Sequence, residues 1–134
     1  MKPQELRPGN FLGIDLKETP ENFHTVTEVG HTVQAVDCLY SLEEIEERRC
    51  QKEYFDIGDM EPIPMSKEWL TKLGFTESAK GNWKFPNGWG YVSFQNDVWY
   101  VFMGSTSVSK TYKFVHELQN LYFAMTGEEL IIKK

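Results

Sequence analysis

Short runs of alternating apolar residues, separated by turn-forming residues, occupy most of this 134-residue chain. Such alternation is typical of β-strands with one buried face. One stretch, residues 111–126, has the periodicity of a long helix, because its large apolar residues recur at helical spacing: Phe114, Leu118, Leu121 and Met125. Many short strands with few helices predict an α+β fold.

The clearest local prediction is a hairpin within residues 23–40. Gly30-His31 near its middle suits a two-residue loop, in which glycine comes first. The register that follows pairs Val26 with Ala35 and His24 with Asp37.

Residues 1–61 are expected to form an acidic N-terminal β-lobe. Strands are predicted at 12–16, in the hairpin and at 53–57, and short strands at this spacing suit a small SH3-like barrel. Between the hairpin and the last strand, Ser41 and Glu44 match a capping box, which favours a short helix over 41–49. A polar extension of the sheet is the alternative for this segment.

Residues 62–134 are expected to form a C-terminal lobe that packs with the first as one unit. Pro62 and Pro64 exclude a helix at the junction and predict a stiff connector. A short helix capped by Ser66 should follow, and then an antiparallel aromatic sheet with strands at 83–85, 89–94 and 98–103. After the sheet we expect a small-residue loop at 104–109, the long helix and a final strand at 130–132, which gives this lobe two helices.

Charge is distributed unevenly along the chain. Residues 1–65 hold 6 Lys and Arg against 14 Asp and Glu, whereas residues 66–134 hold 8 against 6. Nonspecific affinity for DNA depends on clustered Lys and Arg, so the acidic first part argues against phosphate binding there. The same charge is compatible with a basic protein partner or with a solvated surface.

Few features bear on the compartment in which the protein acts. No stretch reaches the ~20 apolar residues of a membrane span, and residues 1–5 lack the apolar run of a signal peptide. Cys38 and Cys50 have no Cys-x-x-Cys spacing, so we expect two free thiols. The sequence therefore predicts a cytoplasmic protein without membrane association.

Residues with catalytic potential do not form a recognisable set. Cys38 follows Asp37, which the hairpin register places opposite His24, but neighbouring residues of a strand point to opposite faces of the sheet. A cross-strand ion pair on the surface is the simpler interpretation. The three histidines lack the spacing of metal ligands, and no phosphate-binding or hydrolase motif occurs. We therefore predict no catalytic residue, no metal and no cofactor.

The aromatic strands carry large rings on both faces of the predicted sheet. Trp89 and Tyr91 share one face of their strand, and Trp99 lies on the next strand. One helix covers only one face, so the other face must pack on the first lobe, on a partner or a second copy in a homodimer, or on a nucleic acid or sugar. The few nearby lysines favour packing over stacking on bases.

A second face of the long helix combines polar and aromatic side chains: His116, Gln119, Asn120 and Phe123. An exposed ring beside amides and an imidazole suits a recognition patch. The alternative is that Phe123 packs under the N-terminal lobe while His116 and Asn120 bond to the backbone of a loop.

Three stretches carry a resemblance to known sequences. They are residues 5–10 (ELRPGN), residues 61–70 (EPIPMSKEWL) and residues 115–130 (VHELQNLYFAMTGEEL). Together they resemble a group of small uncharacterised proteins from phages, prophages and mobile elements of Bacteroides-type bacteria. Pro8 departs from the pattern, which has an apolar β-former there. The resemblance implies a biological setting but no activity, cofactor or site residue.

Three classes of function follow from these observations. The favoured one is a non-enzymatic accessory protein of a phage or mobile element that binds another protein through its acidic or aromatic surface. The second is a nucleic-acid-associated protein that uses the aromatic sheet, and the third is an enzyme with a site of unrecognised type.

Overall fold

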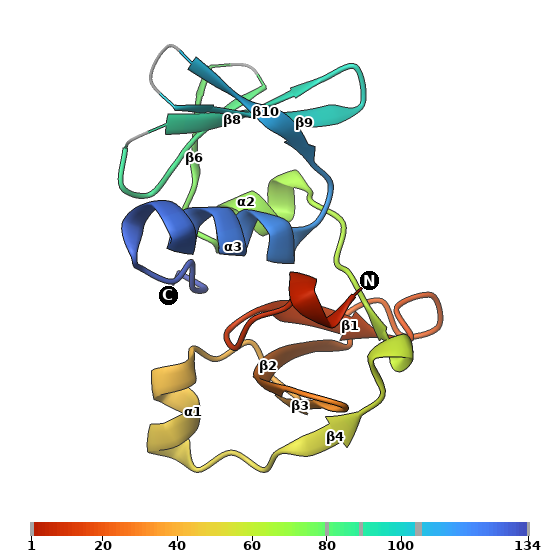
Figure 1. Cartoon of the computed structure of the whole chain (residues 1–134). Helices are drawn as coiled ribbons and strands as arrows, with labels where there is room; N and C mark the ends of the chain where they lie inside the picture. The colour runs from red at the N-terminus through yellow and green to blue at the C-terminus, as the bar shows by residue number, and fades with distance from the viewer. Residues whose placement is uncertain (1, 80, 89, 104–105, 134) are drawn as a thin grey trace. The chain divides into compact units, whose positions relative to one another are not determined.

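A computed structural model describes residues 2–79, 81–88, 90–103 and 106–133 of the chain (Figure 1). It contains two antiparallel five-stranded sheets and three α-helices, which confirms the α+β class. The chain divides into two compact units: unit 1 comprises residues 1–63 and 114–131, and unit 2 comprises residues 64–113 and 132–134. In the part of the chain that the structure describes, no helix combines the length and the apolar character needed to cross a membrane.

The sheet of unit 1 has the strand order β4-β3-β2-β1-β5. Its first strand lies between the second and the fifth, which is the order of the SH3-like barrel predicted for this region. A one-turn 3₁₀ helix directly precedes the fifth strand. The elements are η1 (Pro3–Glu5), β1 (Phe11–Ile14), β2 (Phe23–Val29), β3 (Val33–Val36), α1 (Leu42–Arg48), β4 (Glu53–Phe55), η2 (Ile57–Asp59) and β5 (Met60–Glu61).

The β2–β3 hairpin has the predicted partners but not the predicted loop. Val29 pairs with Val33, so the loop holds three residues rather than Gly30-His31 alone. A bulge between Val26 and Glu28 then shifts the register, and Val26 faces Ala35 as expected. The bulge adds one residue to β2 and so compensates for the longer loop.

Helix α1 confirms the capping box. The Ser41 hydroxyl accepts a hydrogen bond from the Glu44 backbone N–H, and the Glu44 carboxylate accepts one from the Ser41 N–H. These two bonds satisfy donors that an uncapped helix would leave unpaired. The helix ends at Arg49, which has left-handed backbone geometry (φ 50°).

The core of unit 1 is mostly aliphatic, although Phe11 and Tyr122 are also buried in this unit. Leu12 and Val26 are fully buried on neighbouring strands, and the close approach of the Leu16 side chain to Gly13 leaves no space there for a Cβ atom. Any larger residue at Gly13 would therefore displace Leu16. The buried cluster comprises Leu6, Leu12, Val26, Val33, Ala35 and Met60, with Ile14, Val29, Phe55 and Ile57 at its border.

Unit 2 begins with α2 (Lys67–Lys72), which Ser66 caps as predicted, and continues as a meander with the order β10-β9-β8-β7-β6. Its strands are β6 (Thr76–Ala79), β7 (Asn82–Lys84), β8 (Gly90–Gln95), β9 (Val98–Met103) and β10 (Thr106–Tyr112). Strands β6 and β10 were not predicted. The segment from Thr106 is a strand and not the expected small-residue loop; Gly104 and Ser105 lie outside the described residues.

Two predictions about the C-terminal region are wrong. Helix α3 (Val115–Thr126) begins four residues later than the apolar periodicity suggested, because Thr111 and Tyr112 pair with β9. Residues 130–132 form no strand within the described part of the chain. Gly127 ends α3 in left-handed geometry (φ 75°), as its position predicted.

Helix α3 also belongs to a different unit from the one that its sequence position suggested. The predicted lobe 62–134 contained it, whereas residues 114–131 cluster with the first sheet. At the crossing point the Val115 backbone N–H donates to the Ile63 carbonyl oxygen over 2.8 Å. Unit 1 is thus assembled from two segments distant in sequence.

Candidate functional site

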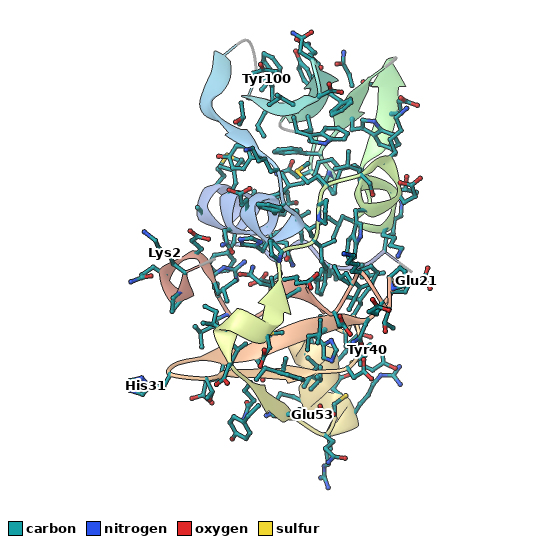
Figure 2. All side chains as sticks on the ribbon, turned by 90° about the vertical axis from the view of Figure 1, so that its right-hand side faces the viewer. Lys2, Glu21, His31, Tyr40, Glu53 and Tyr100 are labelled. Carbon is teal, nitrogen blue, oxygen red and sulfur yellow. The ribbon has the colours of Figure 1, made fainter. Side chains whose placement is uncertain are left out.

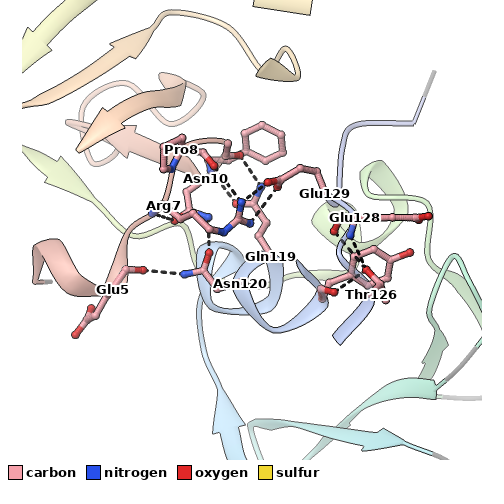
Figure 3. A network of polar contacts seen from close by, with 12 residues as sticks. Glu5, Arg7, Pro8, Asn10, Gln119, Asn120, Thr126, Glu128 and Glu129 are labelled. Carbon is pink, nitrogen blue, oxygen red and sulfur yellow. Dashed lines mark hydrogen bonds and ion pairs between the residues drawn. The ribbon is translucent and has the colours of Figure 1, made fainter. Parts of the chain in front are cut away.

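Gln119 joins α3 to the start of the first sheet. Its side chain is fully buried, its Oε1 accepts a hydrogen bond from the Phe11 backbone N–H over 2.8 Å, and its Nε2 donates to the Gly9 carbonyl oxygen over 2.9 Å (Figure 3). Both ends of the amide are therefore occupied by main-chain groups of the N-terminal segment. A buried amide in this arrangement holds the two segments together.

Asn120 extends the same arrangement by one residue. Its Oδ1 accepts from Asn10 Nδ2 over 2.8 Å, and its Nδ2 donates to the Glu5 carbonyl oxygen over 2.8 Å (Figure 3). Asn10 is fully buried and its Oδ1 accepts from the Arg7 backbone N–H. The residues between Glu5 and Phe11 are thus fixed along α3 by side-chain amides.

Arg7 completes the contact at the C-terminal end of α3. Its guanidinium lies 4.1 Å from the centre of the Phe123 ring and forms a two-nitrogen ion pair with the Glu129 carboxylate. Phe123 is 38% exposed. We call Glu5, Arg7, Asn10, Gln119, Asn120, Phe123 and Glu129 the N-terminal network.

The four residues of the predicted recognition patch therefore differ in their surroundings. Gln119 and His116 are buried, and the His116 ring stacks on Phe114 with centroids 6.0 Å apart. Asn120 bonds to loop backbone, and Phe123 is covered in part by Arg7. The hydrogen bond from Asn120 to backbone agrees with the packing alternative, whereas the exposed part of Phe123 agrees with the recognition patch.

His24 and Asp37 do form a cross-strand contact, at 3.6 Å between Nε2 and Oδ1. His24 is nevertheless buried, and its ring packs edge-on against Phe55 with centroids 5.3 Å apart. The expected surface pair is therefore a buried imidazole with an exposed carboxylate. In the described residues no group of three or more His, Cys, Asp or Glu is placed to hold a metal ion.

The Cys38 thiol lies beside Cys50, and both thiols are free and half-buried. Burial raises the pKa of the Cys38 thiol, and the neighbouring Cys50 raises it further. The Cys38 thiol is therefore protonated at neutral pH, whereas a nucleophilic cysteine needs a depressed pKa. This argues against the nucleophile that His24, Asp37 and Cys38 suggested in sequence.

The predicted aromatic residues of the second sheet divide between its two faces. Trp99 is buried on the face that includes Val92 and Val101. Tyr91 lies on the other face, stacked on Phe102 with centroids 4.9 Å apart. Figure 2 shows Tyr100 on this second face, away from α2. Trp89 lies outside the described residues.

The division into units sharpens the charge asymmetry. Unit 1 holds 6 Lys and Arg against 17 Asp and Glu, a formal charge of −11, whereas unit 2 holds 8 against 3, a formal charge of +5. By position in the sequence, residues 1–65 carry −8 and residues 66–134 carry +2. The charges of the units are larger because residues 114–131, with three acidic residues, belong to unit 1. The two units therefore present opposite fields to charged partners.

Sequence reasoning missed one exposed residue, Tyr54. It lies on β4, a strand expected at 53–57, and its side chain is 69% exposed. The alternation around it was visible in sequence, but nothing there showed that β4 would be an edge strand. Its position in the sheet depends on which other strands pair, and those pairings are set by long-range contacts.

No model of a known protein family matches this chain, and no curated protein or solved structure is significantly similar to it. The functional argument therefore depends on the geometry and charge described above.

Proposed function

We propose that this protein is a non-enzymatic accessory protein that binds a basic protein partner through unit 1, in the phage or mobile-element setting that the sequence resemblance implies. The observation that carries the proposal is the formal charge of −11 on unit 1, beside +5 on unit 2. A surface of one sign attracts partners of the opposite sign over about a Debye length and raises their association rate.

The polar residues that the sequence analysis singled out also support this proposal. The amides of Gln119 and Asn120 bond to the segment between Glu5 and Phe11, and the raised pKa of Cys38 keeps its thiol protonated. By contrast, many acidic side chains of unit 1 are exposed, among them Glu43, Glu46 and Glu47 on α1. Exposed carboxylates are therefore the main charged groups of unit 1 that a partner can contact.

The test is capture of partners by the tagged full-length chain from a Bacteroides-type lysate, with and without nuclease, followed by mass spectrometry. We expect to capture a basic protein in stoichiometric amount, and we expect its binding to survive nuclease treatment.

The second measurement uses the purified partner. The double change Glu43→Gln and Glu47→Gln should lower its association rate a few-fold at low salt. Glu68→Gln with Asp97→Asn removes the same charge from unit 2 and is the matched control. Loss of the captured protein on nuclease treatment would contradict the proposal.

Unit 2 supports a second candidate function, binding of single-stranded nucleic acid. Its formal charge is +5, and Lys84 is the cross-strand neighbour of Tyr91 on the face that carries Phe102 and Tyr100. Aromatic rings beside cations are the usual platform for stacked bases. Fluorescence anisotropy with a labelled single-stranded oligonucleotide tests it: Tyr100→Ala should weaken binding that falls with salt, and Phe94→Ala, on the opposite face, should not.

A further inference from the structure

Among the strands that the structure describes, β4 lies at one edge of the sheet of unit 1 and pairs only with β3 (Figure 1). In an antiparallel pair, alternate residues direct their N–H and C=O groups away from the partner strand. Among the described residues, no backbone group of Glu53, Tyr54 or Phe55 is bonded outside the ladder with β3. This edge is therefore a template for a further strand.

Tyr54 is held in position on this edge although it is largely exposed. Gln34 Nε2 donates to its hydroxyl oxygen over 3.0 Å, and Gln34 Oε1 accepts from the Thr27 hydroxyl over 2.9 Å. The chain of hydrogen bonds crosses β2, β3 and β4. A tyrosine fixed in this way offers a large contact area at low entropic cost, which is the property of a binding hot spot.

The charge around β4 selects what can pair there. Glu53 on the strand and Asp56 and Asp59 just beyond it are exposed, and the nearest lysine, Lys52, lies 4.0 Å from Glu46. Residues 52–59 hold one Lys against three Asp and Glu, so two copies of this edge would bring together segments of the same net charge, which disfavours their association. A strand that carries Lys or Arg would instead place opposite charges across the pair.

We propose that the outer edge of β4 binds an extended basic segment of another protein as a sixth strand, with Tyr54 as its main side-chain contact. The inference rests on the proposed function and names the partner chemistry and the surface that it uses. Main-chain hydrogen bonds supply affinity in this mode of recognition, and the alternate side chains supply specificity. The acidic residues admit a basic strand and oppose acidic ones.

The experiment measures binding of a fluorescent ten-residue peptide, in which Lys alternates with Val, to the full-length chain by anisotropy. Two further probes share its length: one has Glu in place of Lys, and one is N-methylated at alternate backbone nitrogens and keeps every charge. We expect the Lys peptide to bind with an affinity that falls as salt is added, and the other two peptides not to bind.

Variants of the protein test the role of Tyr54. Tyr54→Ala should weaken binding of the Lys peptide about tenfold. Phe94→Ala is the matched control, because it removes an exposed aromatic residue from unit 2 and should change nothing.

The outcomes separate this inference from the proposed function. Equal binding of the N-methylated peptide, or unchanged affinity of the Tyr54→Ala variant, overturns strand addition but leaves an acidic unit that attracts basic partners. Self-association that Tyr54→Ala abolishes, seen by sedimentation velocity, also overturns it, because the edge would then serve a second copy. No binding of the Lys peptide, together with no nuclease-resistant partner in a lysate, overturns both.

Discussion

The two units of this protein are stabilised by different chemistry. The buried apolar residues of unit 1 are mostly aliphatic, with Phe11 and Tyr122 as its buried rings, and side-chain amides join its two distant segments, as in the bonds from Gln119 to Gly9 and Phe11. Unit 2 is a meander of consecutive strands whose buried residues are largely aromatic: Trp69, Phe75, Trp83, Phe85, Trp99 and Tyr112. One unit thus depends on hydrogen bonds across more than 100 residues of sequence, and the other on rings packed between neighbours.

The units also differ in formal charge, −11 for unit 1 and +5 for unit 2. Amides and aliphatic side chains hold unit 1 together, so its many carboxylates are free to remain at the surface in water. Backbone hydrogen bonds also join distant segments of unit 2: the Met65 N–H donates to the Lys113 carbonyl oxygen, and the Lys133 N–H donates to the Lys72 carbonyl oxygen. We expect changes in one unit to be felt first in that unit.

The largest effect is expected from the aromatic core of unit 2. Phe85 is buried and packs edge-on against Phe75 with centroids 5.2 Å apart. Phe85→Ala should lower the free energy of unfolding by about 4 kcal/mol, because it removes a buried ring and leaves a cavity. Hydrogen exchange should accelerate in β7–β9 more than in β1–β3. Equal acceleration in both sheets would contradict a division into two cooperative regions.

A somewhat smaller effect is expected from Gln119 in unit 1. Gln119→Ala leaves the Gly9 carbonyl and the Phe11 N–H without their partner in a buried site, which should cost about 3 kcal/mol in a urea titration. Gln51→Ala removes an exposed amide of unit 1 and should cost less than about 0.5 kcal/mol. A loss below about 1 kcal/mol for Gln119→Ala would show that the N-terminal segment is held by other contacts.

The contact between Arg7 and Phe123 should contribute less, because the ring is partly exposed. A double-mutant cycle with Arg7→Ala and Phe123→Ala should give a coupling of about 0.5–1 kcal/mol. Phe123→Ala alone should cost about 1–2 kcal/mol, well below the loss for a fully buried ring. A coupling indistinguishable from zero would mean that Arg7 is fixed by Glu129 and not by the ring.

Alkaline pH should weaken unit 1 in a graded way. Burial raises the pKa of Cys38 and of Tyr122, and the nearby negative charge of Glu128 raises the pKa of Tyr122 further. A raised pKa in the folded state means that folding favours the protonated group. Its contribution is therefore complete below the ordinary values, about 8.5 for Cys and 10 for Tyr, and is lost as pH rises through the raised ones. Urea titrations between pH 8 and 11 should show this loss, and Tyr122→Phe should flatten it. Stability that rises over this range would contradict it.

Local patterns in the sequence predicted local structure well. The capping box of Ser41 and Glu44 and the cap at Ser66 depend on neighbouring residues, and both are present. Val26 also pairs with Ala35, but only because a bulge in β2 offsets the longer loop. Strand β10 was missed because its small polar residues resemble a loop when considered alone. It is a strand because β9 supplies a partner.

The site was less predictable than the fold. The pattern at 116–123 showed that α3 has a second polar face, but Gln119 and Asn120 find their partners in residues 5–11, and no local spacing encodes that contact. The edge position of Tyr54 likewise follows from the order of the whole sheet. Both features depend on tertiary pairing, which overrides local pattern.

The central claim is that unit 1 recognises a basic protein segment. The most direct measurement is a heteronuclear NMR titration of the labelled full-length chain, first with the Lys peptide and then with a single-stranded oligonucleotide. The account predicts that the peptide shifts the amide resonances of residues 53–56 and of β3 and leaves β7–β9 unchanged. Shifts that appear only in β7–β9, and only with the oligonucleotide, would contradict the claim and assign the binding activity to unit 2.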